Sequence, residues 1–488
     1  MSQVSNSLLH ERLRSIVGED NIVEAEQEGT AHSMNCNWYT RQMWMDDKDI
    51  PIPAVGVYPQ TTDQVSDILT LAQKESIPVT PFGMGSSAMG GNVPEYGGIL
   101  VDLKRMNDIK QVNEESHFAT VQPGVGNWEY EDRLNELGYT SGHLPASHYS
   151  ASVGGMLALR SAGRLSTAYG KIEDMILGLT VVLPDGSVVE TKPVPAHAAG
   201  PDIDQLFVGS EGAFGIITEA TLEIHPYPKE RKFRAILFED FESGFDAMRD
   251  IVQTGLTPAL ARLYTEEETA RTFKETWGLE REGAYAILSW DGPEAVVNAK
   301  RDEALEICEQ AGGEDMGAER GEEWWNNRYA DYYPDEDSVQ NYKALRGGHQ
   351  NGTGGTVTTS VSYDQAEEAY EEMKIAFKDQ FADDYEAWIH AHFSHWYNSG
   401  TMFYCRWHLR DIPDDQDMFK LYNKVWSTLV PVSLKYDGVV DHHHGTGRLL
   451  GRFLREQDEG SHDLLEDIKK SVDPENIMNP GVMGLEGR

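Results

Sequence analysis

The sequence predicts an α+β protein of two domains, and three observations carry this prediction. The chain has 488 residues, which is more than one hydrophobic core usually covers. In its first half, short apolar runs alternate with stretches of helical periodicity, and a glycine-rich loop follows one of these runs at Pro81–Asn92. After Pro228 the composition changes to strands that alternate with charged helices. We therefore expect a first domain over residues 1–230 and a second domain over residues 231–440.

The N-terminal elements can be placed from periodicity and capping residues. Leu8–Val17 has apolar residues at helical spacing and is followed by Gly18, which predicts a short helix. Residues 50–59 contain several X-Pro steps and should be extended. Thr61 and Gln64 have the spacing of a capping box, so a second helix is expected to begin there. The apolar face of that helix would consist of Val65, Ile68, Leu69 and Ala72.

The rest of the first domain alternates strands with a further helix. Residues 98–103 and 118–125 are predicted strands, and a Pro-Asp-Gly turn at 184–186 predicts a hairpin after the buried strand 175–183. Asn127 is expected to cap the helix that follows the second of these strands.

The second domain should contain long helices and loops marked by paired glycines. Phe241–Thr254 and Glu294–Ala311 are predicted helices. Loops are predicted at Gly312-Gly313, at Gly347-Gly348 and over Gly352–Gly355.

The loop Pro81–Asn92 is the strongest functional signal in the first domain. It holds four glycines and two serines, so its backbone can turn tightly and point several N–H groups at one anion. It lacks the lysine of a P-loop, and the Pro94 that follows prevents the helix of a dinucleotide fingerprint. Alone, the loop could equally be an ordinary glycine-rich turn. Three more places allow a backbone to approach a large flat ligand, and together they favour a bound dinucleotide: Gly154-Gly155, Gly163 to Gly170, and Gly209 to Thr218.

Several motifs recur in the order that one known family shows. They are Gly142-His143-Leu144-Pro145, Ser152-Val153-Gly154-Gly155, Tyr169 to Asp174, Gly200-Pro201-Asp202-Ile203, Gly209 to Thr218, and His442-His443-His444-Gly445-Thr446-Gly447. With these motifs the chain resembles the vanillyl-alcohol oxidase and p-cresol methylhydroxylase family of FAD enzymes, and within it most of all the alkyl-dihydroxyacetone-phosphate synthases. The resemblance implies a two-subdomain FAD-binding domain of the p-cresol methylhydroxylase type and an α+β cap domain for the substrate. It also implies that the C-terminal segment, residues 441–488, returns to the FAD-binding domain.

The resemblance further implies which residues contact FAD. Pro81–Ser87 would hold the diphosphate, Ala146–Ser152 and Ala158–Ser161 would line the side of the flavin, and Glu211–Ile217 would bind the adenine and ribose. Many relatives tether FAD through a histidine in the first loop, where this chain has Met84, Ser86 and Ser87, so the cofactor is expected to be non-covalent there. The expected contacts are Pro81, Phe82, Gly83, Met84, Gly85, Ser86, Ser87, Ala146, Ser147, Tyr149, Ser152, Gly154, Gly155, Ala158, Arg160, Ser161, Gly163, Tyr169, Gly170, Glu211, Gly212, Gly215, Ile216 and Ile217.

Acid–base chemistry is expected on Tyr404, His443 and His444, which match the family's catalytic positions. Three adjacent imidazoles suit proton transfer near neutral pH, and a phenol near histidines can take or give a proton. The alternatives are histidines that are only hydrogen-bonded in a wall and a tyrosine that is only packed.

A divalent metal is a further alternative for the histidines. His390 and His392 would share one face of a strand because strand side chains alternate. With His395 and His443 they could ligate one ion, as in related 2-hydroxy-acid dehydrogenases of this superfamily. Histidines without metal remain the alternative reading.

The expected substrate contacts are His392, Lys343, Arg346 and His442. In the synthases two arginines serve the phosphorylated substrate. Here Lys343 and Arg346 do not align cleanly with the first, and His392 replaces the second. Without two charge-assisted contacts, phosphate binding would lose roughly several kcal/mol. At this point the chain departs from the synthases.

The predicted function is the oxidation of an alcohol or a 2-hydroxy acid. The substrate carbon would give a hydride to FAD, and Tyr404 with His443 or His444 would take the hydroxyl proton. Oxygen or another electron acceptor would then reoxidise the flavin. The alternatives are an alkyl-dihydroxyacetone-phosphate synthase, which exchanges an acyl for an alkyl group without net redox change, and a non-catalytic FAD-binding module.

The composition limits the partners and the compartment. The net charge is −40, from 81 acidic and 41 basic residues, so neither nucleic acid nor an anionic membrane is an expected partner. The acidity fits a solvated surface or adaptation to a salty cytoplasm. Three scattered cysteines, and no apolar run near the ~20 residues of a membrane span, favour a soluble cytoplasmic protein. A small-molecule substrate is the expected partner, and a homodimer stays open.

Overall fold

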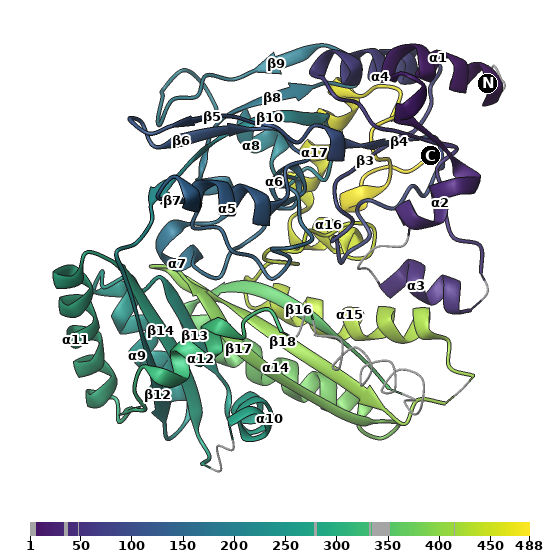
Figure 1. Cartoon of the computed structure of the whole chain (residues 1–488). Coiled ribbons are helices and arrows are strands. Elements are labelled where there is room, and N and C mark those ends of the chain that lie inside the picture. The colour runs from purple at the N-terminus through teal and green to yellow at the C-terminus, as the bar shows by residue number, and fades with distance from the viewer. Residues whose placement is uncertain are drawn as a thin grey trace. The chain divides into compact units, whose positions relative to one another are not determined.

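The computed structural model describes residues 6–33, 38–46, 48–277, 281–330, 333, 352–413 and 415–488. The chain divides into two compact units, each with its own sheets (Figure 1). Unit 1 consists of Met1–Ala162, Lys171–Tyr227 and His443–Arg488, and unit 2 consists of Gly163–Gly170 and Pro228–His442. Each unit is therefore assembled from segments that lie far apart in the sequence.

Unit 1 begins with a four-stranded sheet built around a β-α-β crossover. The strands β2, β4 and β3 are parallel, because the helix α4 carries the chain from β2 back to the start of β3. As predicted, Thr61 caps α4 by accepting the backbone N–H of Gln64 at 3.2 Å, and the four apolar residues of its inner face are fully buried. These residues share a core with α1 and the strands, and their burial stabilises the packing of α4 on the sheet. The bounds are α1 Asn6–Val17, β1 Ile22–Glu24, α2 Ala25–Ser33, α3 Trp38–Met45, β2 Val55–Val57, α4 Thr62–Lys74, β3 Val79–Phe82 and β4 Ile99–Asp102, with strand order β1-β2-β4-β3.

A five-stranded antiparallel sheet forms the second part of unit 1. The hairpin predicted at 184–186 joins β8 to β9. Asn127 does not cap a helix: it is the first residue of α5, and its side chain is bonded to the carbonyl of His143 at 3.1 Å and to Nδ1 of His148 at 2.9 Å. That prediction was wrong because Asn127 is fully buried and these two partners occupy its amide group. The bounds are β5 Ile109–Asn113, β6 Phe118–Val121, α5 Asn127–Glu136, β7 Tyr139–Thr140, α6 Val153–Leu159, β8 Ile176–Val182, β9 Val188–Glu190, α8 Asp204–Phe207, β10 Ile216–Glu223 and β11 His225–Pro226, with sheet order β5-β6-β10-β8-β9 and a separate β7-β11 pair.

The C-terminal segment of unit 1 pairs with β3. The N–H of Val79 donates to the carbonyl of Ile477 at 2.7 Å, and the N–H of Asn479 donates to the carbonyl of Val79 at 2.8 Å. The last residues therefore extend the sheet from which the glycine-rich loop leaves. The helices before this segment are α16 Leu454–Gln457 and α17 Glu459–Val472.

Unit 2 is built on one seven-stranded antiparallel sheet, with α9, α11 and α14 in contact with its strands (Figure 1). Phe393 of β17 packs against Phe241 and Phe245 of α9 and against Tyr370 of α14, with ring centroids 4.8, 5.6 and 5.9 Å apart. Because side chains alternate along a strand, His392 points to the opposite face of the sheet. The bounds are α7 Ser166–Tyr169, β12 Glu230–Phe238, α9 Phe241–Gln253, β13 Leu260–Tyr264, α10 Glu266–Trp277, β14 Ala284–Gly292, α11 Glu294–Gln310, β15 Glu314–Asp315, α12 Glu319–Asn326, β16 Thr353–Ser362, α14 Tyr363–Phe381, β17 Glu386–Trp396, β18 Gly400–Arg410 and α15 Met418–Lys435, with sheet order β15-β12-β14-β13-β17-β18-β16.

One glycine-rich stretch is a strand and not the predicted loop. β16 begins at Thr353, inside Gly352–Gly355. The prediction was wrong because the glycines here make room for a large neighbour: Gly355 pairs with Trp407, and a Cβ at Gly355 would lie 2.7 Å from the indole ring. The predicted loop at Gly347-Gly348 lies outside the described residues.

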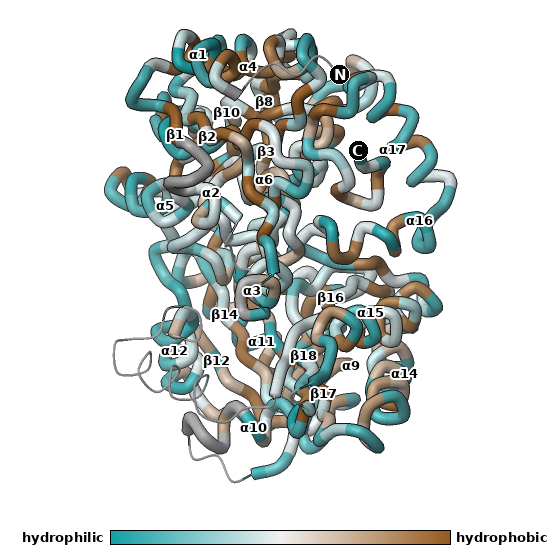
Figure 2. Tube along the Cα trace, turned by 90° about the vertical axis from the view of Figure 1, so that its right-hand side faces the viewer, coloured by the Kyte–Doolittle hydropathy of each residue, from teal (hydrophilic) through white to brown (hydrophobic). Residues whose placement is uncertain are grey.

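Hydropathy follows burial within unit 1. In Figure 2 the strand β8 is mainly brown, whereas α16 and α17 carry teal stretches. None of the helices in the described part of the chain has the length and apolar character that crossing a bilayer requires.

Candidate functional site

The glycine-rich loop after β3 meets two other segments of unit 1. A Cβ at Gly83 would collide with Oγ of Ser152, and a Cβ at Gly212 would lie 2.7 Å from Cγ of Pro81. Ser152 itself caps α6 by accepting the N–H of Gly155 at 3.3 Å. The folded chain thus brings together three of the segments for which the sequence predicted contacts with FAD, and their approach depends on glycine.

A buried polar group stands beside the 146–161 region. His143 contacts Oγ of Ser161 through Nε2 at 2.7 Å. Burial, and then the positive charge of Lys171, lower the pKa of His143 to about 3, so the imidazole is neutral at physiological pH. His143 therefore contributes a hydrogen-bonding group beside Ser161 without adding a charge.

The turn at Gly209–Thr218 binds the loop that carries the adjacent histidines. Oε1 of Glu211 accepts the N–H groups of Thr446 and Gly447 at 2.8 and 2.9 Å. The rings of His443 and His444, just before these residues, lie 4.1 Å apart between centroids. Two expected catalytic residues are therefore held in unit 1 by a side chain that was expected to contact the cofactor.

The segment Gly163–Gly170 belongs to unit 2, although its sequence neighbours on both sides belong to unit 1. Ser166 hydrogen-bonds with Nδ1 of His395, and the hydroxyl of Tyr169 donates to Asp291 at 2.8 Å. The expected FAD contacts Gly163, Tyr169 and Gly170 are thus placed in unit 2, where the side chain of Tyr169 bonds to the cap sheet.

In unit 2, β17 and β18 form a polar face opposite the aromatic core. His392 pairs with Tyr404 across the two strands, and their rings stack with centroids 4.9 Å apart and planes 12° apart. Burial, and then the positive charges of Arg262 and Arg406, lower the pKa of His392 well below its usual value. His392 is therefore a neutral base beside a phenol, with two cations nearby.

His390 lies on the same face but has different partners. Its Nδ1 bonds to the buried carboxylate of Glu268, and its Nε2 lies 3.1 Å from Nε2 of His408. Since Nδ1–H of His390 donates its hydrogen bond to the carboxylate, Nε2 of the neutral ring accepts a hydrogen bond from Nε2–H of His408. Both ring nitrogens of His390 are thus engaged.

His395 and His442 form a separate pair in unit 2. His395 lies at a β-bulge with φ 54°, and its ring stacks on His442 with centroids 5.2 Å apart. Nε2 of His442 bonds to the hydroxyl of Tyr397 at 2.7 Å. Of the four histidines considered as metal ligands, His390 is bonded to Glu268, His392 stacks on Tyr404 and His395 stacks on His442.

Sequence reasoning missed three residues of the polar face, namely Arg262, Arg406 and Glu268. Arg406 lies two residues after Tyr404 on β18, so alternation alone could have found it. Arg262 is on β13 and Glu268 on α10, and no local pattern links them to Tyr404. The expected substrate contacts Lys343 and Arg346 lie outside the described residues.

Comparison with known proteins gives two matching family descriptions, "FAD binding domain" over residues 53–192 and "FAD linked oxidases, C-terminal domain" over residues 227–483. The chain is 30% identical to alkyldihydroxyacetonephosphate synthase of Trypanosoma brucei brucei, over 96% of this chain and 79% of the relative. It is 31% identical to the uncharacterised FAD-linked oxidoreductase YgcU of Escherichia coli (strain K12), over 98% and 99%, and 26% identical to glycolate oxidase subunit GlcD of Bacillus subtilis (strain 168), over 88% and 89%.

Solved structures share the fold at low identity. One of an alkyldihydroxyacetonephosphate synthase superposes with a TM-score of 0.79 at 24% identity, covering 96% of this chain and 85% of that one. One of p-cresol methylhydroxylase with substrate bound superposes with a TM-score of 0.75 at 18% identity, covering 100% and 98%. The α+β fold with an FAD-binding domain, expected from the sequence, is confirmed, and the chain belongs to the family of FAD-linked oxidases.

Proposed function

We propose that this protein oxidises a 2-hydroxy acid or a closely related alcohol with FAD as the hydride acceptor. The observation that supports it most directly is the polar face of unit 2, where Tyr404 and His392 stack and Arg262 and Arg406 bring two positive charges to bear on His392. A base and a phenol suit removal of a hydroxyl proton, and the cations suit a carboxylate next to that hydroxyl.

The residues present in unit 1 fit FAD. Among the described residues, Oγ of Ser87 is buried without a hydrogen-bond partner, at the end of the loop that would hold the diphosphate. A hydroxyl donor with no protein partner matches a phosphate oxygen. Pro81–Ser87 would hold the diphosphate, and the start of α6 with Ser161 would line the flavin. FAD, when bound, supplies a two-electron acceptor for the hydride from the substrate carbon.

Side chains of this protein would accept the proton of the substrate hydroxyl group. Neutral His392, whose lowered pKa makes it a weak base, can accept a hydrogen bond, and the stacked Tyr404 brings a phenol hydroxyl to the same face. His443 or His444 would serve as the other acceptor. Oxidation of the hydroxyl carbon to a carbonyl releases one proton and one hydride, so one such base is sufficient.

The arginines would select an anionic substrate. Nε of Arg262 is buried and has no hydrogen-bond partner among the described residues, while its guanidinium lies over the rings of Tyr264 and Trp324 at 5.4 and 5.1 Å. Stacking fixes the guanidinium plane, and a carboxylate could use the remaining donor. The neutral alternative, an alcohol without a carboxylate, would leave the buried Nε of Arg262 without an acceptor.

A second candidate is acyl-for-alkyl exchange on a phosphorylated ketone. The observation that favours it is the same pair of arginines, because two cations at one face also suit a phosphate. The sequence placed no arginine at the positions that serve phosphate in the synthases, whereas Arg262 and Arg406 restore two positive charges near Tyr404.

Anaerobic titration of the holoenzyme separates these candidates. We expect 2-hydroxy acids, and not aromatic alcohols, to bleach the flavin absorbance, and Tyr404→Phe to slow bleaching by about 10²- to 10⁴-fold with FAD content unchanged. Incorporation of a labelled fatty alcohol into acyl-dihydroxyacetone phosphate, without bleaching, would replace this proposal by the second candidate. Neither reaction, with a fully loaded flavin, would indicate a non-catalytic FAD-binding protein.

A further inference from the structure

One oxygen of the Glu211 side chain is committed to contacts within the protein. Its Oε1 accepts the N–H groups of Thr446 and Gly447 at 2.8 and 2.9 Å, and the Thr446 hydroxyl lies at 3.4 Å. Glu211 also has a left-handed backbone with φ 51°, which is uncommon for a residue other than glycine. The sequence had suggested contact with the adenine and ribose of FAD for this residue.

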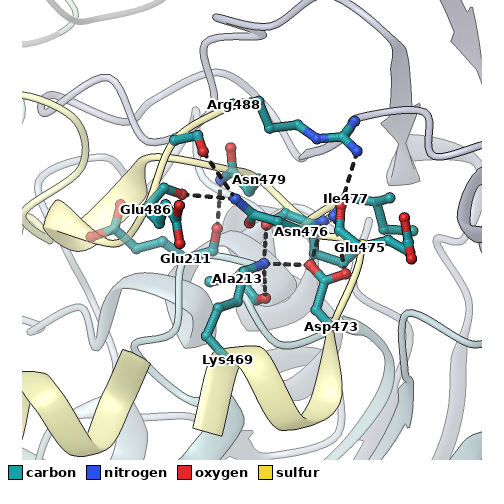
Figure 3. Close-up of polar contacts among 12 residues, drawn as sticks. Glu211, Ala213, Lys469, Asp473, Glu475, Asn476, Ile477, Asn479, Glu486 and Arg488 are labelled. Carbon is teal, nitrogen blue, oxygen red and sulfur yellow. Dashed lines mark hydrogen bonds and ion pairs between the residues drawn. The ribbon is translucent and has the colours of Figure 1, made fainter. Parts of the chain in front are cut away.

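A second set of bonds fixes the same point from the C-terminal segment. The amide of Asn479 donates to the carbonyl of Glu211 and to the carbonyl of Gly91, both at 2.7 Å. Arg448 in turn donates to Oδ1 of Asn479 at 2.8 Å. Figure 3 shows Glu211 next to Asn479, with the Lys469 and Asp473 ion pair nearby. The glycine-rich loop, the 209–218 turn and the C-terminal segment therefore meet at Glu211.

Oε2 of Glu211 is buried without a hydrogen-bond partner among the described residues, and two glycines lie close to the carboxyl group. A Cβ at Gly91 would collide with Oε2 of Glu211, and a Cβ at Gly445 would lie 3.0 Å from Oε1 and 2.5 Å from Leu159. The carboxyl group is thus enclosed by glycines of the segments that it joins.

We propose that Glu211 is a positioning residue, whose Oε1 holds the loop of His443 and His444 through the amides of Thr446 and Gly447. The inference depends on the proposed function only where it assigns proton transfer to those two histidines. The structural part, that Glu211 fixes the loop, does not depend on any reaction.

The ionisation of Glu211 gives a separate signature of this role. Burial raises the pKa of its carboxyl group to about 7, opposed by the amides of Gly447 and Thr446 and by the positive charge of Arg448. Arg448 lies on the same loop as these amides, and the nearest ion pair of the C-terminal segment, Lys469 with Asp473, is internally neutralised. A carboxyl group with a raised pKa favours the folded state below its unfolded pKa, and this contribution is lost as the pH rises toward 7.

Hydrogen exchange of the holoenzyme tests the positioning role without turnover. In Glu211→Ala we expect the amides of Thr446 and Gly447 to exchange about tenfold faster or more, because each loses its acceptor. In Glu211→Gln, which keeps an acceptor oxygen, we expect exchange close to that of the wild type. Glu131→Gln is the matched control: Glu131 is equally buried and accepts the N–H of Ser141 at 2.9 Å, far from Thr446 in the sequence, so those two amides should not change.

Three outcomes would overturn the inference. The first is unchanged exchange at Thr446 and Gly447 in Glu211→Ala together with loss of FAD, which would make Glu211 a cofactor ligand. The second is a melting temperature of Glu211→Gln that follows pH as the wild type does. We expect instead that the wild type loses stability relative to Glu211→Gln as the pH rises from about 5 to about 8. The ratio of their unfolding equilibrium constants should change on the order of a hundredfold. The third is a Glu211→Ala enzyme with unchanged kcat. If no substrate is turned over by the wild type, the proposed function fails while the exchange result still decides the role of Glu211.

Discussion

The two candidate regions of the molecule are built in opposite ways. In unit 1 the site is made of backbone: glycine turns that approach one another so closely that a Cβ at Gly83 or at Gly447 would collide with its neighbour. In unit 2 the site is made of side chains that stand on regular strands, with His392 opposite Tyr404 and His390 opposite Arg406. In the first region, therefore, only residues without a side chain fit at the close turns. In the second region, the functional group of every other strand residue is what matters.

This difference decides how each region should respond to substitution. A backbone site fails when a side chain is added, because the turn itself must move. A site of side chains on a strand fails when a functional group is removed, while the fold persists because β17 and β18 remain paired. Variants of the two kinds should separate stability from catalysis.

The largest effect is expected from Gly447→Ala in unit 1. Gly447 has φ 51°, and a Cβ there would collide with the carbonyl oxygen of Met89. Because two backbone segments would have to separate, we expect a loss of about 3 kcal/mol in the free energy of unfolding and reduced FAD retention. Denaturant unfolding and the flavin-to-protein absorbance ratio measure both.

Gly138→Ala is the matched control for that variant. Gly138 also has a positive φ, 82°, but no heavy atom of the described residues lies within 4 Å of a Cβ built there. Only the backbone strain remains, which costs about 1 kcal/mol. If both variants lost the same stability, the close approach of the loops would not be what limits unit 1.

The next effect is expected from Arg262→Leu in unit 2. If Arg262 binds the substrate carboxylate as proposed, its removal should raise KM for the best 2-hydroxy acid by about 30- to 100-fold and change kcat only a few-fold. The KM for an alcohol without the carboxylate should stay constant. Arg301→Leu, on α11, is the control, because Arg301 is bonded to Asp302 and Asn298 and not to the polar face. An equal rise in KM for both substrates would argue against a carboxylate at Arg262.

The same contrast explains what could be predicted from the sequence. Glycine loops leave a contiguous motif, so Pro81–Ser87 and Gly209–Thr218 could be found before the fold was known. The capped helix α4 could be placed because Thr61 and its apolar face lie within one short stretch. Arg262 and Glu268 could not be found, since they reach the polar face from β13 and α10 through pairing of distant segments. The contacts of Glu211 with Thr446 and Gly447 could not be predicted for the same reason, because these partners lie more than 200 residues away.

A pH-dependent effect should sharpen the comparison inside unit 1. The pKa of buried His143 is lowered to about 3. As the pH falls below about 6.5, this histidine therefore becomes protonated in the unfolded chain but stays neutral in the folded chain. Wild-type stability should therefore decline from about pH 7 to about pH 5, by about 2 kcal/mol on account of this residue. His143→Gln keeps a partner for Ser161 and should remove that part of the slope, as melting curves at the two pH values would show. An unchanged slope would mean that other groups govern acid sensitivity.

The smallest effect distinguishes a side chain kept for FAD from one kept for the fold. Ser87 and Ser210 are both buried serines of unit 1, but the Ser210 hydroxyl donates to the carbonyl of Phe207 at 2.7 Å, whereas the Ser87 hydroxyl has no partner among the described residues. Ser87→Ala should leave the apoprotein's stability within about 0.5 kcal/mol and weaken FAD binding about 5- to 10-fold, through one lost bond to phosphate. Ser210→Ala should do the reverse and cost about 1 kcal/mol of stability with little change in FAD affinity. Flavin titration of the two apoproteins, together with their unfolding curves, measures both quantities. If Ser87→Ala destabilised the apoprotein and bound FAD normally, the loop after β3 would be structural, and the diphosphate would have to be held elsewhere in unit 1.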